Sequence, residues 1–330
     1  MFKDFDRLIA RFRQFGGWRL VWQYARMGVL WTGAKELVRC ILHRRSVKAA
    51  YPVITEKVNS LLLEQYKYVL EDGLQKYGAA NEKATEQKKP RVIWTTWLQG
   101  EDKAPEMMKV GWNSWRRYLP DYELRIITME NLSQWTILPD WFVEKYRKGI
   151  VPPALFSDVM RLDLLVRHGG TWMDGTVLCT GFPTERLQRK WEEIEASKLC
   201  LFRYFQRGRK EPVGMSTWFI SARQGNAALA TARDMMLAYW CDYNCTVDYY
   251  LPHLCIGAAL NRMPALVAAM PRCNNTHSVL LGASLGRDFD KAAWKDLTDH
   301  VSFHKLNFRK SEEAALNPRS YYNFIVKYEE

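Results

Sequence analysis

The stretch "FSDVMRLDLLVRHGGTWMDGTV" (residues 156–177) decides the fold. It continues a helix that we predict to begin near Pro153, because apolar residues recur at helical spacing. These positions are Leu155, Val159, Leu162 and Val166. Two glycines then end the helix, and "TWMD" (171–174) begins a strand.

Three charged residues flank this glycine turn. Asp158 and Arg161 lie three positions apart, so they share a helix face and could simply form a surface ion pair. Asp174 follows two apolar residues and should emerge at the carboxyl end of its strand, the edge where open α/β sheets bind ligands. We therefore expect these three side chains to form a ligand site, with the glycines allowing close approach.

Patterns on both sides of this stretch predict an α/β fold with a mostly parallel central sheet flanked by helices. Residues 91–98 and 122–128 read as strands around a helix at 104–119, which makes a βαβ unit. Further along, we predict strands at 198–205, 216–223 and 301–308 and helices at 226–240 and 247–260. Walker A, G-x-G-x-x-G, H-E-x-x-H and G-x-S-x-G motifs are missing, which removes common rival enzymes.

Residues 1–89 differ from the remainder of the chain. The first 50 residues carry eleven Lys/Arg against three acids, and Phe2, Phe5, Leu8, Ile9 and Phe12 recur at helical spacing. This pattern is typical of a basic amphipathic helix, which either packs on the main domain or contacts an anionic membrane surface. Nucleic-acid binding is not expected, because no nucleic-acid module accompanies the charge. A helix at 54–77 and a linker at 78–90 complete this basic helical region, and 90–330 is the second domain.

Composition places the protein in the cytoplasm. Apolar residues make up 48% and charged residues 25% of the 330-residue chain, as in soluble globular proteins. The seven cysteines are odd in number and contain no C-x-x-C pair, which favours a reducing compartment. We find neither an apolar run of the ~20 residues that span a bilayer nor a signal-peptide core.

The pattern AxxSDxxRxxLLxxxGGTWMD (154–174) resembles the central motif of the glycosyltransferases of family 32, in particular their capsular polysaccharide synthesis branch. Ordered flanking segments agree, among them "PRVIWTTWLQG", "STWFISARQGN", "VDYYLPHL" and "HKLNF". The resemblance covers roughly residues 90–308. It implies a GT-A fold, a nucleotide-sugar donor, a divalent cation (Mn²⁺ or Mg²⁺) and retention of anomeric configuration.

The resemblance also implies roles for single residues. Asp158 and Arg161 would bind the donor sugar and its phosphate side, and Asp174 would be the first acid of an Asp-x-Asp motif that binds metal. Thr176 stands where that motif has its second acid, which puts two-carboxylate metal binding in doubt. Asp174 can still bind the ion or the ribose alone, because the diphosphate supplies further oxygens.

Seven other residues are candidates whose structural alternatives stay open. The resemblance implies that His304 is a metal ligand and that Lys305 contacts the diphosphate. The alternative is that both residues simply end a strand. Arg309 is a weaker candidate than this pair. Asp248 is a catalytic acid or a helix N-cap. Trp97 and Gln99 follow the first strand and would contact the base, and Trp218 lines the sugar pocket or the core. Trp94 and His253 are expected in the core.

These features predict a bacterial glycosyltransferase that moves a hexose from a nucleotide diphosphate sugar, favouring a UDP-sugar, onto a saccharide acceptor. We expect a lipid-linked acceptor, a role in capsule or surface polysaccharide synthesis, and a peripheral place on the inner face of the cell membrane. The alternative is a degenerate GT-A scaffold that binds sugar nucleotide or partner proteins without turnover.

Overall fold

A computed structural model describes residues 17–83, 88–205 and 214–329. In this part of the chain six strands form one central sheet in the order β2-β1-β3-β6-β5-β7. The strands are β1 (Val92–Thr96), β2 (Glu123–Ile127), β3 (Gly170–Met173), β5 (Leu199–Arg203), β6 (Met215–Ala222) and β7 (Cys273–Asn274). Strand β6 is antiparallel to both neighbours and the other pairs are parallel, which confirms the predicted mixed α/β class with a mostly parallel sheet.

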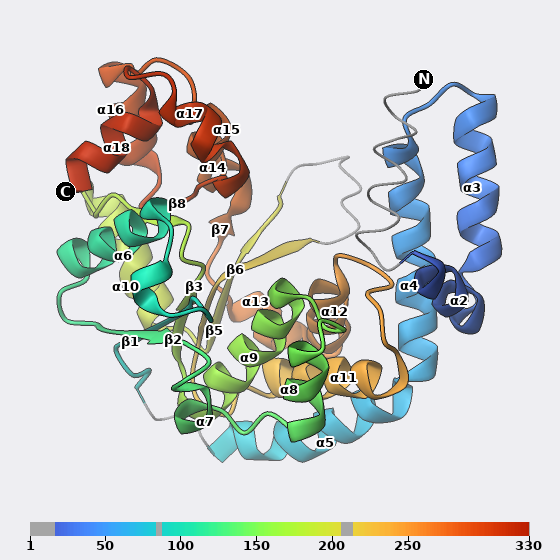
Figure 1. Cartoon of the computed structure of the whole chain (residues 1–330). Coiled ribbons are helices and arrows are strands. Elements are labelled where there is room, and N and C mark those ends of the chain that lie inside the picture. The colour runs from blue at the N-terminus through green and yellow to red at the C-terminus, as the bar shows by residue number, and fades with distance from the viewer. Residues whose placement is uncertain (1–16, 84–87, 206–213, 330) are drawn as a thin grey trace.

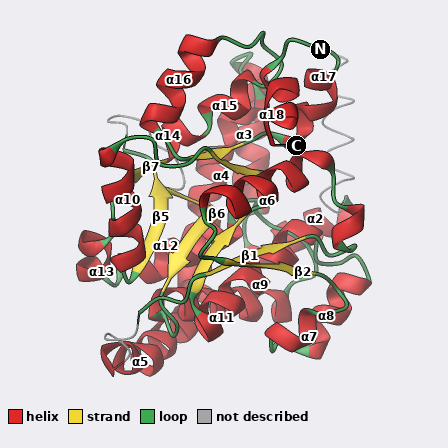
Figure 2. Ribbon diagram, turned by 90° about the vertical axis from the view of Figure 1, so that its left-hand side faces the viewer, coloured by secondary structure: helices red, strands yellow, loops and turns green. Residues whose placement is uncertain are grey.

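Helices cover both faces of the sheet (Figure 1). The helices α9 (Pro153–His168) and α12 (Leu251–Asn261) pack on one face, with α11 (Ala227–Asp242) and then α5 (Lys67–Lys83) outside them. On the other face lie α6 (Glu106–Tyr118) and α10 (Glu185–Ala196) (Figure 2). The predicted helix at 104–119, the strands around it and the helix beginning at Pro153 are therefore confirmed.

The change from α9 to β3 depends on glycine. Gly169 and Gly170 have φ of 70° and 98°. A Cβ on Gly169 would lie 2.7 Å from the Gln224 nitrogen, and one on Gly170 would lie 2.7 Å from the Val92 oxygen. Since real Cβ atoms do not approach so closely, these two positions accept only glycine, and the helix leads directly into the centre of the sheet.

Buried indoles join the layers by hydrogen bonds as well as by packing. Trp94 is fully buried, and its Nε1 donates to the Gly169 oxygen at 2.8 Å. Trp115 Nε1 donates to the Val177 oxygen at 2.9 Å. A buried Trp is stable when its N–H finds an acceptor. The expected core position of Trp94 is confirmed.

The remaining elements surround this core. A separate two-stranded antiparallel sheet pairs β4 (Val177–Cys179) with β8 (Phe303–Lys305). The N-terminal helices are α2 (Trp18–Met27), α3 (Leu30–Leu42) and α4 (Tyr51–Gln65), with the 3-10 turn η1 (Val47–Ala50). Shorter elements are η3 (Glu101–Lys103), α7 (Leu132–Trp135), α8 (Asp140–Arg147) and α13 (Pro264–Ala269). The C-terminal part contains α14 (Asn275–Ser278), α15 (Leu280–Ser284), α16 (Lys291–His300), η4 (Phe308–Lys310), α17 (Ser311–Ala315) and α18 (Tyr321–Glu329).

Three local predictions were wrong or cannot be compared. The predicted linker at 78–90 is helical up to Lys83, because α5 continues along α11. The helix predicted to begin at Val247 begins at Leu251, after a turn held by the Asp248 side chain. The predicted amphipathic helix of Phe2 to Phe12 lies outside the described residues. The domain boundary at residue 89 stays a prediction.

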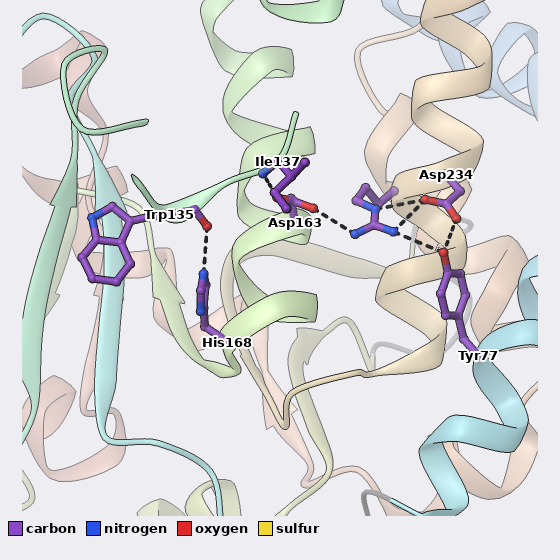
Figure 3. Close-up of polar contacts among 7 residues, drawn as sticks. Tyr77, Trp135, Ile137, Asp163, His168 and Asp234 are labelled. Carbon is purple, nitrogen blue, oxygen red and sulfur yellow. Dashed lines mark hydrogen bonds and ion pairs between the residues drawn. The ribbon is translucent and has the colours of Figure 1, made fainter. Parts of the chain in front are cut away.

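A buried charge network fixes α9 against α5 and α11 (Figure 3). Asp163 is 3% exposed; its Oδ1 accepts from Arg233 Nη1 at 2.9 Å and its Oδ2 from the Ile137 nitrogen at 3.0 Å. Arg233 Nε also donates to Asp234 Oδ1 at 3.0 Å, and the Tyr77 hydroxyl donates to Asp234 Oδ2 at 2.7 Å. One guanidinium therefore connects three helices.

The end of α9 is held separately. His168 Nε2 lies 2.8 Å from the Trp135 oxygen (Figure 3). The His168 ring also lies beside Trp94, with the centroids 5.3 Å apart. Contacts at both the middle and the end of α9 thus set the position of this helix before any ligand binds.

We predict that Arg233→Met lowers the free energy of unfolding by about 3–5 kcal/mol, because it leaves the buried Asp163 carboxylate without its partner. Adding Asp163→Asn should recover part of this loss, since an amide oxygen can still accept from Ile137. Urea unfolding measures both variants. The control is Arg189→Met in the exposed pair with Glu185, which should cost less than about 1 kcal/mol. An Arg233→Met loss no larger than that of the control would contradict the prediction.

Candidate functional site

Asp158 and Arg161 form a buried ion pair on α9. They are 8% and 6% exposed, and Arg161 Nη2 lies 3.2 Å from Asp158 Oδ1. The interpretation as a surface pair is therefore wrong. The pair is buried because every residue of α9 from Leu155 to Leu165 is buried, so this helix has no face toward solvent in that region.

Asp174 lies at the carboxyl end of β3, as predicted, and meets the same guanidinium. Its Oδ1 is 3.3 Å from Arg161 Nη2 and accepts from Trp172 Nε1 at 3.0 Å. Arg161 Nη1 donates to the Thr217 oxygen at 2.5 Å, and its guanidinium carbon lies 4.7 Å from the centre of the Trp172 ring. Arg161 thus bridges both acids and connects α9 to β3 and β6.

The small sheet of β4 and β8 brings Lys305 to this cluster. In its register Val177 pairs with Lys305. Lys305 Nζ donates to Asp174 Oδ2 at 2.8 Å and to Thr176 Oγ1 at 2.5 Å. The side chains of Lys305 and Asp174 are each 26% exposed, so this end of the cluster opens to solvent.

The two acids differ in their protonation. Burial raises the pKa of Asp158 to about 6; the positive charge of Arg161 opposes this shift and the negative charge of Asp174 adds to it. Burial would also raise the pKa of Asp174, but Lys305 and Arg161 outweigh it, and the pKa ends below its ordinary value. Asp174 is therefore the permanently charged acid of the pair.

The charges of the cluster change the pKa of two further side chains, His253 and Tyr249. Burial and then the charge of Arg161 lower the pKa of His253 to about 4, and its Nδ1 is buried without a partner. Desolvation and the charges of Asp158 and Asp174 raise the pKa of Tyr249, whereas Arg309 lowers it. Sequence reasoning missed Tyr249 and expected His253 in the core; their signal was the adjacency to Asp248 in "VDYYLPHL".

Asp248 does not join these residues. Its Oδ2 accepts from the Thr55 hydroxyl of α4 at 2.6 Å, and its Oδ1 accepts from the Tyr250 nitrogen at 2.7 Å. It is not the N-cap of α12 either, because that position is Tyr250. The structure gives Asp248 a bridging contact to the N-terminal helices.

His304 is also separated from Asp174. It is fully buried, and its Nε2 lies 3.1 Å from Thr180 Oγ1. Since neighbouring residues of a strand point to opposite faces, Lys305 takes the face toward Asp174 and His304 the other. The described residues contain no group of three His, Cys, Asp or Glu that could hold a metal ion. Because His304 and Lys305 point to opposite faces of β8, these side chains do not fit a metal site that pairs Asp174 with His304, whereas metal binding by Asp174 together with a diphosphate stays a prediction.

The aromatic candidates take different positions. Trp218 is 6% exposed, and its Nε1 donates to Asn275 Oδ1 at 2.7 Å, so its ring belongs to the core while its backbone oxygen accepts from the Asp174 nitrogen at 2.9 Å. Trp97 and Gln99 follow the end of β1, which is parallel to β3, and thus lie at the same sheet edge as Asp174. Trp97 is partly buried and Gln99 exposed.

Comparison with known proteins assigns the family. A family model described as "Capsular polysaccharide synthesis protein" matches residues 46–325. The chain belongs to this family. The match confirms the capsular branch of the predicted resemblance, whereas the wider family 32 and a metal-binding Asp-x-Asp motif stay predictions.

Other comparisons add little to this family assignment. No curated protein sequence matches the chain significantly. A solved structure titled "PaToxG Glycosyltransferase" matches with 12% identity and a TM-score of 0.39, covering 80% of this chain and 98% of that chain.

We predict that Asp158→Asn removes a pH dependence of stability. In the folded chain Asp158 keeps its proton up to about pH 6, against 3.8 as the ordinary value. Between these values the folded state binds more protons, so this group's contribution to stability falls as pH rises from about 4 to about 6. Unfolding free energies of both proteins, measured from about pH 4 to about pH 7, should converge toward the acid end. A pH-independent difference between them would contradict the raised pKa.

Proposed function

We propose that this member of the capsular polysaccharide synthesis family is a glycosyltransferase. In this proposal it transfers a hexose from a nucleoside diphosphate sugar, favouring a UDP-sugar, to a saccharide acceptor in surface polysaccharide assembly. Retention of configuration is carried over from the resemblance. The observation that supports this proposal is the cluster of Asp158, Arg161, Asp174 and Lys305 at the carboxyl end of β3.

The chemistry of transfer requires such a cluster. Breaking the bond between an anomeric carbon and a phosphate oxygen leaves negative charge on the diphosphate, which cationic donors stabilise. Lys305 offers an ammonium at the open end of the cluster, and Arg161 holds Asp174 in place from the buried side. Trp97 and Gln99, at the same sheet edge, are proposed contacts of the nucleotide base.

The acceptor is proposed to be lipid-linked, with the protein peripheral on the inner face of the cell membrane. No helix in the described part of the chain is long and apolar enough to cross a bilayer. The N-terminal helices instead expose large apolar side chains, which we call the tryptophan face. It consists of Trp18, Trp22, Trp31, Ile41 and Leu42.

An anionic lipid surface fits the tryptophan face by chemistry. Trp18 and Trp31 are 81% and 84% exposed, and Trp is the side chain that favours the boundary between headgroups and acyl chains. Residues 17–45 add six Lys/Arg against one acid, Glu36. Each cation gains about 1 kcal/mol near an anionic surface.

Two hydrogen bonds connect helix α2 of the tryptophan face to the domain that holds the cluster. The Tyr24 hydroxyl of α2 donates to the Val247 oxygen at 2.9 Å, and Arg26 Nη1 donates to the Asp242 oxygen at 2.9 Å. Docking through this face would therefore fix the orientation of the site relative to the membrane.

We predict that Asp174→Asn lowers turnover with a UDP-sugar at least about 100-fold, because Lys305 loses its charged partner and Arg161 loses one of its two. UDP release in the presence of saccharide acceptor measures turnover, and calorimetric titration with UDP, GDP and CMP measures nucleotide binding. Asp121→Asn, at an exposed acid paired with Arg91, is the control and should leave both unchanged. Nucleotide binding without turnover on any sugar would favour the non-catalytic scaffold, and no nucleotide binding at all would refute the donor site.

We predict that the triple change of Trp18, Trp22 and Trp31 to Ala weakens vesicle binding at least about tenfold, since each buried indole removes a large apolar area from water. Co-sedimentation of the full-length protein with phosphatidylglycerol-containing and purely zwitterionic vesicles measures the loss. Leu316→Ala, at an 83% exposed residue, is the control. If wild type ignores anionic vesicles and the triple variant instead loses a dimer in sedimentation velocity, the face is a self-association surface and the membrane proposal fails.

A further inference from the structure

Lys305 occupies the position that a metal would need beside Asp174. Its Nζ lies 2.8 Å from Asp174 Oδ2 and 2.5 Å from Thr176 Oγ1, the two side chains of the Asp-x-Thr segment. The position is set by main-chain pairing, because the Leu306 nitrogen donates to the Thr176 oxygen at 2.9 Å. The ammonium is therefore a built-in part of this site.

The donor set leaves little room for a divalent cation. Asp174 Oδ1 already faces both Trp172 Nε1 and Arg161 Nη2, and Oδ2 faces the ammonium. Thr176 contributes a neutral hydroxyl in place of a second carboxylate. A divalent ion on Oδ2 would have to displace Lys305 and would meet two positive charges at short range, where repulsion between charges is strong.

The ammonium still has binding capacity. It carries three N–H donors, and two of them are directed to Asp174 and Thr176. Because the Lys305 side chain is 26% exposed, the third can reach an incoming anion. Arg309 lies in the 3-10 turn that follows β8, four residues after Lys305.

The charges of the cluster balance without metal. Arg161 and Lys305 carry two positive charges against the two acids Asp158 and Asp174, and the ammonium of Lys305 is the cation that faces Asp174 Oδ2. An oxygen of a diphosphate is the ligand that best completes an ammonium already bound to a carboxylate and a hydroxyl.

We propose that Lys305 takes the place of a divalent cation in this site. Its ammonium binds the diphosphate of the nucleoside diphosphate sugar directly, and donor binding needs no metal ion. This inference rests on the proposed function, since the diphosphate ligand follows from it.

The test is calorimetric titration of the full-length protein with UDP and with inorganic pyrophosphate, once in excess EDTA and once in Mn²⁺. The expected result is the same UDP affinity, within about twofold, in both conditions. Lys305→Met should weaken binding in EDTA at least about tenfold, because a charge-assisted hydrogen bond is lost. The control is Lys291→Met, at an exposed lysine that begins α16.

A second variant tests the exchange of lysine for metal. Thr176→Asp combined with Lys305→Ala restores two carboxylates and removes the ammonium, so UDP binding should become dependent on Mn²⁺. Binding by this double variant that is equal in EDTA and Mn²⁺ would count against the assigned position of the diphosphate.

The decisive measurement is the titration of the wild-type protein, which does not require that any variant folds. UDP binding that requires Mn²⁺ and vanishes in EDTA overturns this inference and leaves the transferase proposal standing. No binding of UDP, GDP or CMP in either condition overturns the proposed function itself and, with it, this inference.

Discussion

The buried guanidinium of Arg161 is the constraint on which the site depends. A buried charge requires partners of opposite charge or hydrogen-bond acceptors, and the Nη atoms of Arg161 find Asp158, Asp174 and the Thr217 oxygen, whereas its buried Nε has no hydrogen-bond partner among the described residues. These partners come from α9, the end of β3 and β6, so one side chain fixes the relative position of three elements. The network of Asp163 and Arg233 separately connects α9 to α11.

The sequence predicted the elements whose signals are local. Apolar spacing, Gly169 and Gly170 were sufficient to locate α9 and β3, and with them Asp158, Arg161 and Asp174. It could not predict which of His304 and Lys305 would reach Asp174, because β8 has three residues and a shift of one residue reverses the side to which each points. The pairing of β4 with β8, which decides this, joins residues more than a hundred positions apart and leaves no local trace.

Asp248 shows a second limit of local patterns. An acid before an apolar helical run is a standard start signal, yet α12 begins three residues later. The carboxylate instead accepts from Thr55, just as Asp242 accepts from Tyr66 at 2.9 Å. Both acids belong to the domain of the central sheet and bind hydroxyls of the N-terminal helices. Tertiary contacts of this kind outweigh local preference, and both lie within residues 46–325, the part of the chain that matches the family.

The identity of residue 176 follows from the same charge logic as Arg161. A second carboxylate at position 176 would add a negative charge beside Lys305, whereas the neutral Thr176 leaves the ammonium to Asp174. A carboxylate at 176 would lie against Lys305 and compete with Asp174 for it, so the Thr hydroxyl and the lysine are suited to each other. The lysine in turn reaches this place only because β8 pairs with β4 in one register. The pairing of β4 with β8, the ammonium of Lys305 and the neutral side chain of Thr176 therefore depend on one another. A change in any of the three would change which cation balances Asp174.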